Sequence, residues 1–400
     1  MSSAFIPFHT PTIGEEEIAE VTAVLRSGWL TTGPRTARFE SDFAKYVQSP
    51  HALAVNSCTA GLHLALAASD IGPGDEVITT PYTFCATVNT ILHVGATPVL
   101  ADIRPDGNID PDAIVARITS ATKAIMPVHI AGLPCDMDRI WRIAKDHGLK
   151  VIEDAAHAAG SHYRGAPIGV AGPSGSAAVA FSFYATKNLT TGEGGMVTCA
   201  DPDLADRMRR LCLHGISRDA WNRYSEEGNW FYQVESCGFK YNLSDLQSAL
   251  GIHQLARLEG FIQRRTELAD LYNREFADLE EVEVPPIHEE TRHSWHLYML
   301  RLNLPKLETS RAKFIQELKG LGIGCSVHFI PIPLHPFFSA LGADSHNQFP
   351  QTLRLYERVV SLPLYPGMTE QQAFRVINAV RETARKNRKA EIVALSGARR

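Results

Sequence analysis

A single lysine, Lys187, lies between an apolar run and a glycine-rich turn in the segment VAFSFYATKNLTTGEGGMV, residues 179–197. Most lysines are solvated surface charges, and that interpretation has to be weighed first. A lysine that is withdrawn from water loses its proton more easily, and its neutral amine can form a Schiff base with an aldehyde. Lys187 is therefore a candidate nucleophile, and the chemistry that its position indicates is that of pyridoxal phosphate.

A turn of small residues, NSCTAG at 56–61, lies between an expected strand at 52–55 and an expected helix at 60–68. Small residues let backbone N–H groups approach a phosphate, and the start of a helix adds positive partial charge. Thr59 could add a hydroxyl donor. Taken alone, the turn is more typical of a plain helix cap, because Ser and Thr cap helices routinely.

An acidic residue, Asp154, ends the apolar strand expected in VIEDAAHAAG, residues 151–160. A carboxylate at the carboxyl end of a strand faces the ligand crevice of an α/β sheet. Paired with a pyridine nitrogen, it would keep that nitrogen protonated and make the ring an electron sink. His157, one helical turn on, would lie on the same side. The alternative is an aspartate that holds Mg²⁺, but the chain has no G-x-x-x-x-G-K-[ST] motif to accompany it.

The segment PYTFCAT at 81–87 offers Phe84 to stack on a planar ring, although an aromatic residue near a strand end more often belongs to the core.

No metal site is expected. His288 and His293 are five residues apart rather than four, and two prolines precede them, which does not suit a zinc helix.

Over the first 200 residues, short β-rich runs alternate with helical patterns, which indicates βα units around a mostly parallel sheet. A helical pattern at 137–148 ends at Gly148. Seven strands are expected, at 52–55, 76–79, 97–101, 123–128, 150–153, 177–183 and 195–199.

The second half begins with a polar and aromatic stretch at 218–240 that predicts an excursion or an interface loop. Ser244 and Gln247 then form a capping-box pattern for a long helix. A smaller α+β unit follows, with a strand at 295–302 and a helix around 311–320. We therefore expect an α/β protein of two domains, a large one at 1–250 and a small C-terminal one at 251–400 whose basic tail is frayed from about residue 385.

The composition limits which kinds of partner and which cellular compartment we expect for this protein. The formal net charge of -5 over 400 residues offers no general basic field, so neither nucleic acid nor an anionic membrane is an expected partner. The 7 cysteines are scattered without a C-x-x-C pair, which is typical of reduced thiols. No apolar run is long enough to span a membrane, and the start MSSAFIPFHT lacks the pattern of a signal peptide. The sequence predicts a cytoplasmic protein.

In chain order, the phosphate turn, the ring-stacking aromatic residue, the strand-end aspartate and the lysine before GEGG resemble the DegT/StrS family of sugar aminotransferases, which are fold type I pyridoxal phosphate enzymes. The likeness covers nearly the whole chain, from PFHTPTIGEEE through SGWLTTGP at 27–34 to SLPLYPGMT at 361–369. The chain is most similar to the branch that acts on UDP-linked 4-keto sugars, including UDP-4-amino-4-deoxy-L-arabinose synthases, which carry similar SGW-TTGP, EDAAHA, KYNL and SLPL strings.

The resemblance implies a role for each motif. Lys187 would form the internal aldimine and shuttle protons, Asp154 would bind the pyridine nitrogen, and His157 would sit near the ring's 3-hydroxyl. Phe84 would stack on the ring. The phosphate would be held by Cys58, Thr59, Ser182 and, from the facing subunit of an obligate homodimer with shared active sites, Asn242.

The resemblance further implies L-glutamate as the amino donor and a nucleotide-linked keto sugar, with UDP and C4 favoured, as the acceptor. Candidate substrate contacts, each with an alternative as a turn, core or surface residue, are Trp29, Thr31, Thr32, Tyr184, Arg218 and His328. Some family members carry histidine in place of the lysine and perform dehydration, so the lysine here favours transamination. A 3-keto sugar or cyclitol aminotransferase is the nearest alternative. A pyridoxal-phosphate-binding regulator without turnover is disfavoured, because sensing alone would not require this proton-transfer set.

Overall fold

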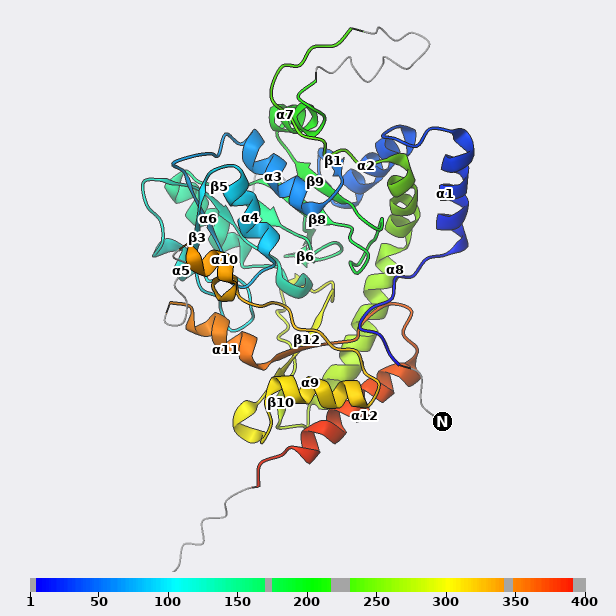
Figure 1. Cartoon of the computed structure of the whole chain (residues 1–400), viewed down its shortest axis with the longest axis vertical. Helices are drawn as coiled ribbons and strands as arrows, with labels where there is room; N and C mark the ends of the chain where they lie inside the picture. Colours follow the sequence, from blue (N-terminus) through cyan, green and yellow to red (C-terminus); the bar gives the residue numbers. More distant parts are fainter. Residues whose placement is uncertain (1–4, 170–174, 217–230, 342–347, 391–400) are drawn as a thin grey trace, which may run out of the picture.

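A computed structural model describes residues 5–169, 175–216, 231–341 and 348–390, and its largest unit is a sheet covered by helices (Figure 1). The strands of this sheet are β1 (His51–Val55), β2 (Glu76–Thr79), β3 (Thr97–Leu100), β4 (Thr122–Met126), β5 (Lys150–Asp154), β8 (Ser176–Ser182) and β9 (Gly195–Cys199). They lie in the order β1-β9-β8-β5-β4-β2-β3. β9 runs antiparallel to both of its neighbours, and the other pairs are parallel. The expected mostly parallel sheet of seven strands is confirmed.

Helices cover both faces of this sheet, which is why its strands read as nearly continuous apolar runs. Successive side chains of a strand point to opposite faces. Val179 and Phe181 of β8 accordingly belong to one core, and Ala178 and Ala180 to the other. The first core is closed by α2 (Pro34–Tyr46), α5 (Pro111–Val115) and α6 (Met137–His147). The second core is closed by α3 (Cys58–Ala68), α4 (Cys85–His93) and α7 (Pro202–Cys212).

A long helix, α8 (Asp245–Phe276), connects this layer to a second unit. It begins with the expected capping box, in which Ser244 and Gln247 each bond to the other's backbone N–H. Ile252 and Leu258 in its first half join a core of the large sheet, whereas Tyr272 and Phe276 near its end join a separate core. The domain division expected at residue 250 falls inside this continuous helix and stays a prediction.

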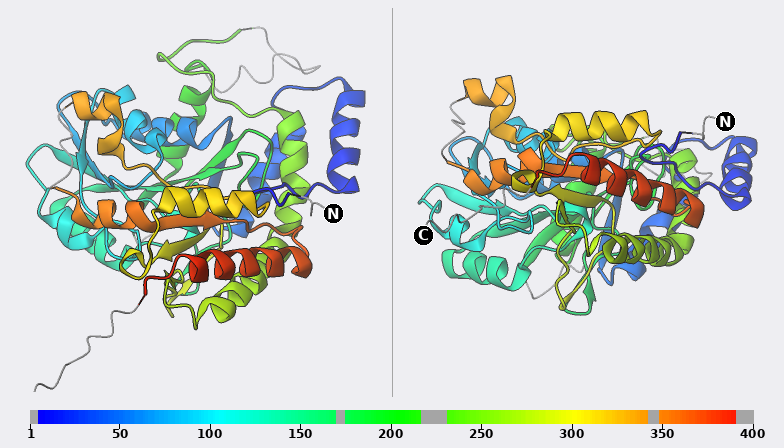
Figure 2. Two further views of the ribbon diagram at one scale, coloured as in Figure 1. Left: turned by 60° about the horizontal axis from the view of Figure 1, so that its bottom comes forward. Right: turned by 90° about the horizontal axis from the view of Figure 1, so that it is seen from below.

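The second unit is a small antiparallel sheet in the order β10-β12-β13, formed by Val282–Glu283, Tyr298–Leu302 and Val359–Leu362. Helix α9 (Arg311–Gly320) packs against β13 and against α12 (Glu370–Lys386), and α12 packs against α8 (Figure 2). The expected smaller α+β part is confirmed. The remaining elements are α1 (Glu15–Ser27), which packs on α8, then α10 (Pro336–Ala340), α11 (Pro350–Arg358), and a sheet of β6 (His162–Tyr163), β7 (Ala166–Pro167) and β11 (Thr291–Arg292).

Two expected elements have different bounds in the structure. The helix expected at 60–68 begins at Cys58, because the Ser57 side chain accepts a hydrogen bond from the Ala60 N–H and so caps an earlier turn. The strand expected at 295–302 begins only at Tyr298. Before it, Trp295 has a φ of 51°, and the Leu297 N–H donates to Ala131 instead of to a strand. Residues 217–230, most of the expected excursion, lie outside the described residues.

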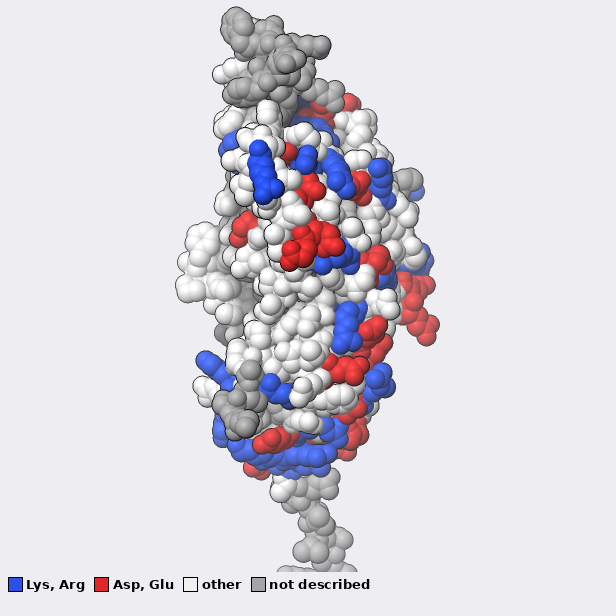
Figure 3. Space-filling view, turned by 90° about the vertical axis from the view of Figure 1, so that its right-hand side faces the viewer, with Lys and Arg blue, Asp and Glu red and all other residues white. Residues whose placement is uncertain are grey.

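Charged side chains of both signs are interspersed on the face that carries α1 and α8 (Figure 3). Basic side chains gather at the lower end of this face. No helix within the described ranges is long and apolar enough to cross a membrane. Among the same residues, no three His, Cys, Asp or Glu side chains are grouped as metal ligands.

Candidate active site

A cavity of about 320 Å³ lies at the carboxyl ends of the parallel strands β1, β2, β5 and β8. This is the place where ligands bind in open α/β sheets. The cavity brings together nine of the side chains that the sequence predicted: Cys58, Thr59, Phe84, Asp154, His157, Ser182, Tyr184, Lys187 and His328. The chain therefore folds these residues, from five separate segments between 58 and 328, around one space.

Lys187 is placed by the turn that joins β8 to β9. Its backbone N–H donates to Tyr184 at 2.9 Å, and the side chain of its neighbour Asn188 donates to the Ser294 carbonyl at 2.9 Å. The return strand must pass close beneath the start of α3. A Cβ on Gly195 would lie 2.7 Å from the Cys58 nitrogen, so only glycine fits there.

Burial lowers the pKa of the Lys187 ammonium from its usual range to about 8. The neighbouring Cys58 and Asp154 side chains oppose this shift, because negative charge near an ammonium raises its pKa. A lysine with a pKa of about 8 has a much larger neutral fraction at pH 7 than a solvated lysine. The amine is therefore prepared to act as a nucleophile and as a base.

Asp154 is a buried carboxylate, 5 % exposed, that forms no ion pair with any residue in the described ranges. Burial raises its pKa, while hydrogen bonds from the Thr87 hydroxyl and the Ala156 N–H lower it. Those bonds measure 2.8 and 3.1 Å. A buried carboxylate that is served mainly by neutral donors suits a ligand that brings its own cation.

His157 presents a defined tautomer to the cavity. Its Nδ1 accepts a hydrogen bond from the Ala131 N–H at 3.2 Å, so the neutral ring carries its proton on Nε2. Burial holds the pKa of this imidazole well below its usual range, which keeps the ring neutral. The ring stacks on Phe329 with 5.6 Å between centroids, and its Nε2 makes no hydrogen bond with any residue that the structure describes.

The start of α3 offers backbone donors for a phosphate, as the sequence predicted. The side chain of Cys58 points elsewhere, since its Sγ lies 3.5 Å from the Ala180 oxygen and 3.9 Å from Asp154 Oδ1. Burial raises the pKa of this thiol well above its usual range. Cys58 can therefore serve a phosphate through its backbone N–H, and Thr59 through its N–H and hydroxyl.

Several cavity residues had no role in the sequence reasoning. Thr87 lies inside the quoted segment PYTFCAT, and its position one turn after Thr83 was the available signal, since the two hydroxyls bond at 2.7 Å. His296 and Phe329 come from the C-terminal part of the chain, where no local pattern marks them. Further lining residues are Ser57, Thr186, Glu193 and Gly194.

Other predicted residues do not reach this cavity within one chain. Asn242 donates to the Thr32 hydroxyl at 2.7 Å, and both line a different cavity. Trp29 is 40 % exposed and donates to the Thr32 carbonyl. Thr31 accepts from the Asp245 N–H at the start of α8. Arg218 lies outside the described residues.

Residues 11–381 match the model of the DegT/DnrJ/EryC1/StrS aminotransferase family. The chain belongs to this family. It is 51% identical over 380 residues to the spore coat polysaccharide biosynthesis protein SpsC of Bacillus subtilis, covering 94% of this chain and 97% of SpsC.

Two solved structures of aminotransferases have the same fold as this chain. Spr1654 of Streptococcus pneumoniae, which is assigned as a sugar aminotransferase and was solved in a PMP-form, is 36% identical with a TM-score of 0.89, covering 95% of this chain and 99% of that one. PseC of Helicobacter pylori, an aminotransferase of pseudoaminic acid biosynthesis, is 30% identical with a TM-score of 0.88, covering 96% of this chain and 100% of that one.

The cavity residues fit the cofactor of this family, pyridoxal phosphate. A buried carboxylate without a cation partner suits the pyridine nitrogen, the helix start suits the phosphate, and a lysine with a lowered pKa suits the aldehyde. Spr1654 was also solved in a PLP-form. The expected family, the enzyme class of pyridoxal-phosphate-dependent aminotransferases and the cofactor are therefore confirmed.

Proposed function

We propose that this chain transfers an amino group from L-glutamate to the keto carbon, at C4, of a nucleotide-linked keto sugar, with UDP as the favoured nucleotide. The observation that carries the proposal is the convergence of Lys187 and Asp154 on one cavity in a chain of this family. The names of SpsC and PseC, which refer to polysaccharide and pseudoaminic acid biosynthesis, support a sugar as the acceptor.

The chain's own groups divide the work of this reaction. When bound, pyridoxal phosphate supplies an aldehyde that takes up the amino group and a ring that draws electrons away from the reacting carbon. Asp154 would hold the pyridine nitrogen protonated, and His157 would offer its Nε2–H to the ring's 3-oxygen. The first turn of α3, together with Ser182, would hold the phosphate, and Phe84 would cover the ring. Lys187 Nζ removes the α-proton of the donor and later returns a proton to the sugar carbon.

We further propose a homodimer in the cytoplasm whose subunits share their active sites. Among the described residues that line the cavity, Lys187 is the only lysine or arginine. The carboxylates of glutamate and the diphosphate of a nucleotide sugar need further cations, which a second copy can supply. Exposed apolar side chains at Ile18, Leu25 and Leu30 favour a partner on the face of α1. All seven cysteines are free thiols, which supports a reducing compartment.

The substrate test uses purified enzyme loaded with pyridoxal phosphate. L-Glutamate is expected to change the visible absorption of the bound cofactor and to release 2-oxoglutarate. UDP- and dTDP-linked 4-keto and 3-keto sugars and a cyclitol ketone are then added separately, and a UDP-linked 4-keto sugar is expected to restore the absorption and yield an amino sugar by mass spectrometry. If glutamate changes nothing, the proposed donor is wrong. Restoration by a cyclitol ketone alone would overturn the sugar assignment.

The shared site is tested by mixing two impaired variants, Lys187→Ala and Asn242→Ala, under conditions that exchange subunits. A mixed dimer then contains one site with both Lys187 of one chain and Asn242 of the other. We expect activity well above the sum of the separate variants. With random pairing, half of the dimers are mixed and each mixed dimer has one restored site of two, so the activity can reach roughly a quarter of the wild-type value. If Asn242 serves the site of its own chain, no mixture regains activity.

A further inference from the structure

The turn that follows β4 has an unusual backbone and contacts the cavity from outside. Ala131 and Gly132 both have positive φ, 58° and 94°. A side chain at Gly132 would lie 2.3 Å from Ser294 Oγ, so the turn has no room to relax in that direction. A non-glycine residue in this conformation is held there by its surroundings. The turn is oriented so that the Ala131 N–H donates to His157 Nδ1 at 3.2 Å.

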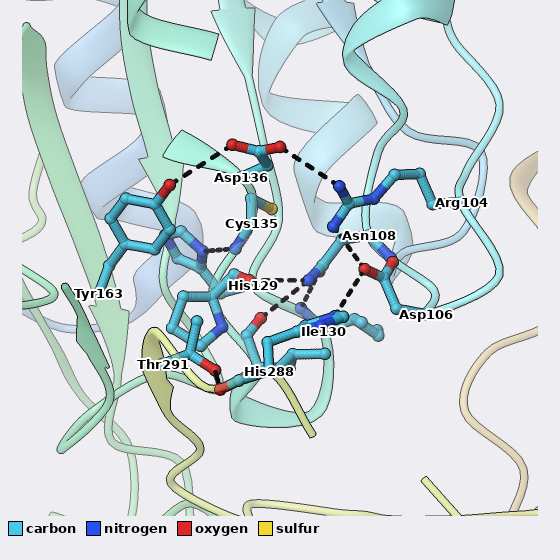
Figure 4. A network of polar contacts seen from close by, with 12 residues as sticks. Arg104, Asp106, Asn108, His129, Ile130, Cys135, Asp136, Tyr163, His288 and Thr291 are labelled. Carbon is cyan, nitrogen blue, oxygen red and sulfur yellow. Dashed lines mark hydrogen bonds and ion pairs between the residues drawn. The ribbon is translucent and has the colours of Figure 1, made fainter. Parts of the chain in front are cut away.

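Asn108, in the loop between β3 and α5, bonds to this turn through its side chain (Figure 4). It is 1 % exposed. Its Oδ1 accepts from the Ile130 N–H at 3.1 Å, and its Nδ2 donates to the Leu133 and Pro134 carbonyls at 3.1 Å each. One side chain thus bonds to both ends of the turn. All three bonds require an amide, because they need an acceptor and two donors in one plane.

Other contacts hold the rest of the turn. Ser161 Oγ and the Ser294 N–H both donate to the Gly132 carbonyl, and the Leu297 N–H donates to the Ala131 carbonyl. His129, just before the turn, is anchored through its ring to Glu153 at 2.8 Å. Within the described residues, Asn108 is the partner of the Ile130 N–H. The Ala131 N–H shares a peptide with the Ile130 carbonyl, which accepts from the Leu133 N–H at 2.8 Å. Because Asn108 bonds to both the Ile130 N–H and the Leu133 carbonyl, it holds the two residues that set the direction of this peptide.

We propose that Asn108 is a positioning residue that fixes the tautomer of His157 through the 130–134 turn. This rests on the proposed cofactor site. With Asn108 in place, the Ala131 N–H occupies Nδ1, and the imidazole keeps its proton on Nε2, where it faces the cavity as a donor. Without Asn108, the Ala131 N–H is free to turn away, and the neutral ring can carry its proton on either nitrogen. An acceptor oxygen on a ring bound in the cavity would then lose its donor for part of the time.

The test observes His157 directly, by NMR of the full-length protein labelled with ¹⁵N-histidine, both without and with bound pyridoxal phosphate. The resonance is assigned by its absence in His157→Phe. We expect the Nε2–H tautomer alone in the wild type and a mixture of both tautomers in Asn108→Ala. The Kd for pyridoxal phosphate is expected to rise about tenfold, the effect of one lost hydrogen bond to a cofactor. Asn108→Asp keeps the acceptor for Ile130 but loses both donors, and a smaller tautomer shift is expected.

A double-mutant cycle separates positioning from general stability. If Asn108 acts through His157, then Asn108→Ala should weaken cofactor binding by less than about twofold in the His157→Phe background. Asn387→Ala is the matched control, because Asn387 is also a buried asparagine with two Nδ2 hydrogen bonds but lies in the C-terminal unit. It should leave the His157 tautomer unchanged. An unchanged tautomer in Asn108→Ala, or the same tenfold loss in both backgrounds, would overturn the proposal. The tautomer of cofactor-free protein reports on Asn108 even if the proposed transamination fails.

Discussion

Lys187→Ala is expected to lower amino transfer by at least about 10³-fold, because no second group in the described cavity can replace its amine. His157, His296 and His328 also line the cavity, but burial lowers the pKa of each, to about 4 for His328 and well below the usual range for the other two. Such weak bases are poor acceptors for a carbon-bound proton. The measurement is release of 2-oxoglutarate from L-glutamate in a single turnover, which isolates the first half-reaction.

The variant should still bind pyridoxal phosphate, because the contacts proposed for the phosphate and the pyridine nitrogen do not involve Lys187. Lys150→Ala is a suitable control. Lys150 is the first residue of β5, at the opposite end of the strand from Asp154 and the cavity, and its ammonium donates to the Ser69 carbonyl. It should keep full turnover. Turnover within about threefold of wild type in Lys187→Ala would refute its role as the proton carrier, and addition of a small primary amine should partly restore the rate if the role is right.

The sheet was predictable from the sequence because its strands are buried on both faces. Each strand appears as a short apolar run, and the seven expected runs match the observed strands to within two residues at each end. The capping box at Ser244 and the stop at Gly148 were equally local signals. The start of β12 was not predictable from the sequence, because the segment before it bonds to the distant turn at Ala131. Local strand propensity does not depend on such a long-range contact.

From the residues alone, the site was predictable where its side chains lie on or shortly after the ends of those strands, whereas His328 was named only through the family resemblance. Asp154 is the last residue of β5, Lys187 lies in the turn after β8, and parallel strands bring such ends together at one edge. His296 and Phe329 come from the second unit. They reach the cavity only because α8 holds the two sheets in a fixed relative position. The tautomer of His157 depends on Asn108, forty-nine positions earlier in the chain, through a turn whose backbone is unusual. Spacing rules describe neighbours within one element and cannot report such contacts.

Asp154→Asn is expected to reduce amino transfer by about 10² to 10³-fold while leaving the fold intact or slightly more stable. The carboxylate keeps the pyridine nitrogen protonated in the proposed site, and an amide of the same shape cannot. In the cofactor-free protein the same charge lowers the stability of the fold, since burial raises the pKa of Asp154 above its ordinary value. A raised carboxyl pKa means that the ionised form destabilises the fold, and this penalty grows as the pH rises above the unfolded value. Replacing the charge with an amide removes the penalty.

Two measurements therefore move in opposite directions in Asp154→Asn. Exchange of the glutamate α-proton with solvent deuterium, followed by NMR, should slow by the full factor, and the thermal midpoint of the cofactor-free protein at pH 7 should stay level or rise. Thr87→Val, which removes the 2.8 Å bond to Asp154 Oδ2 but keeps the charge, should slow exchange only several-fold. Glu281→Gln alters a buried carboxylate that pairs with Arg388 in the C-terminal unit, and should lower the thermal midpoint without slowing exchange. Asp154→Asn with normal exchange would show that this carboxylate does not hold the pyridine nitrogen.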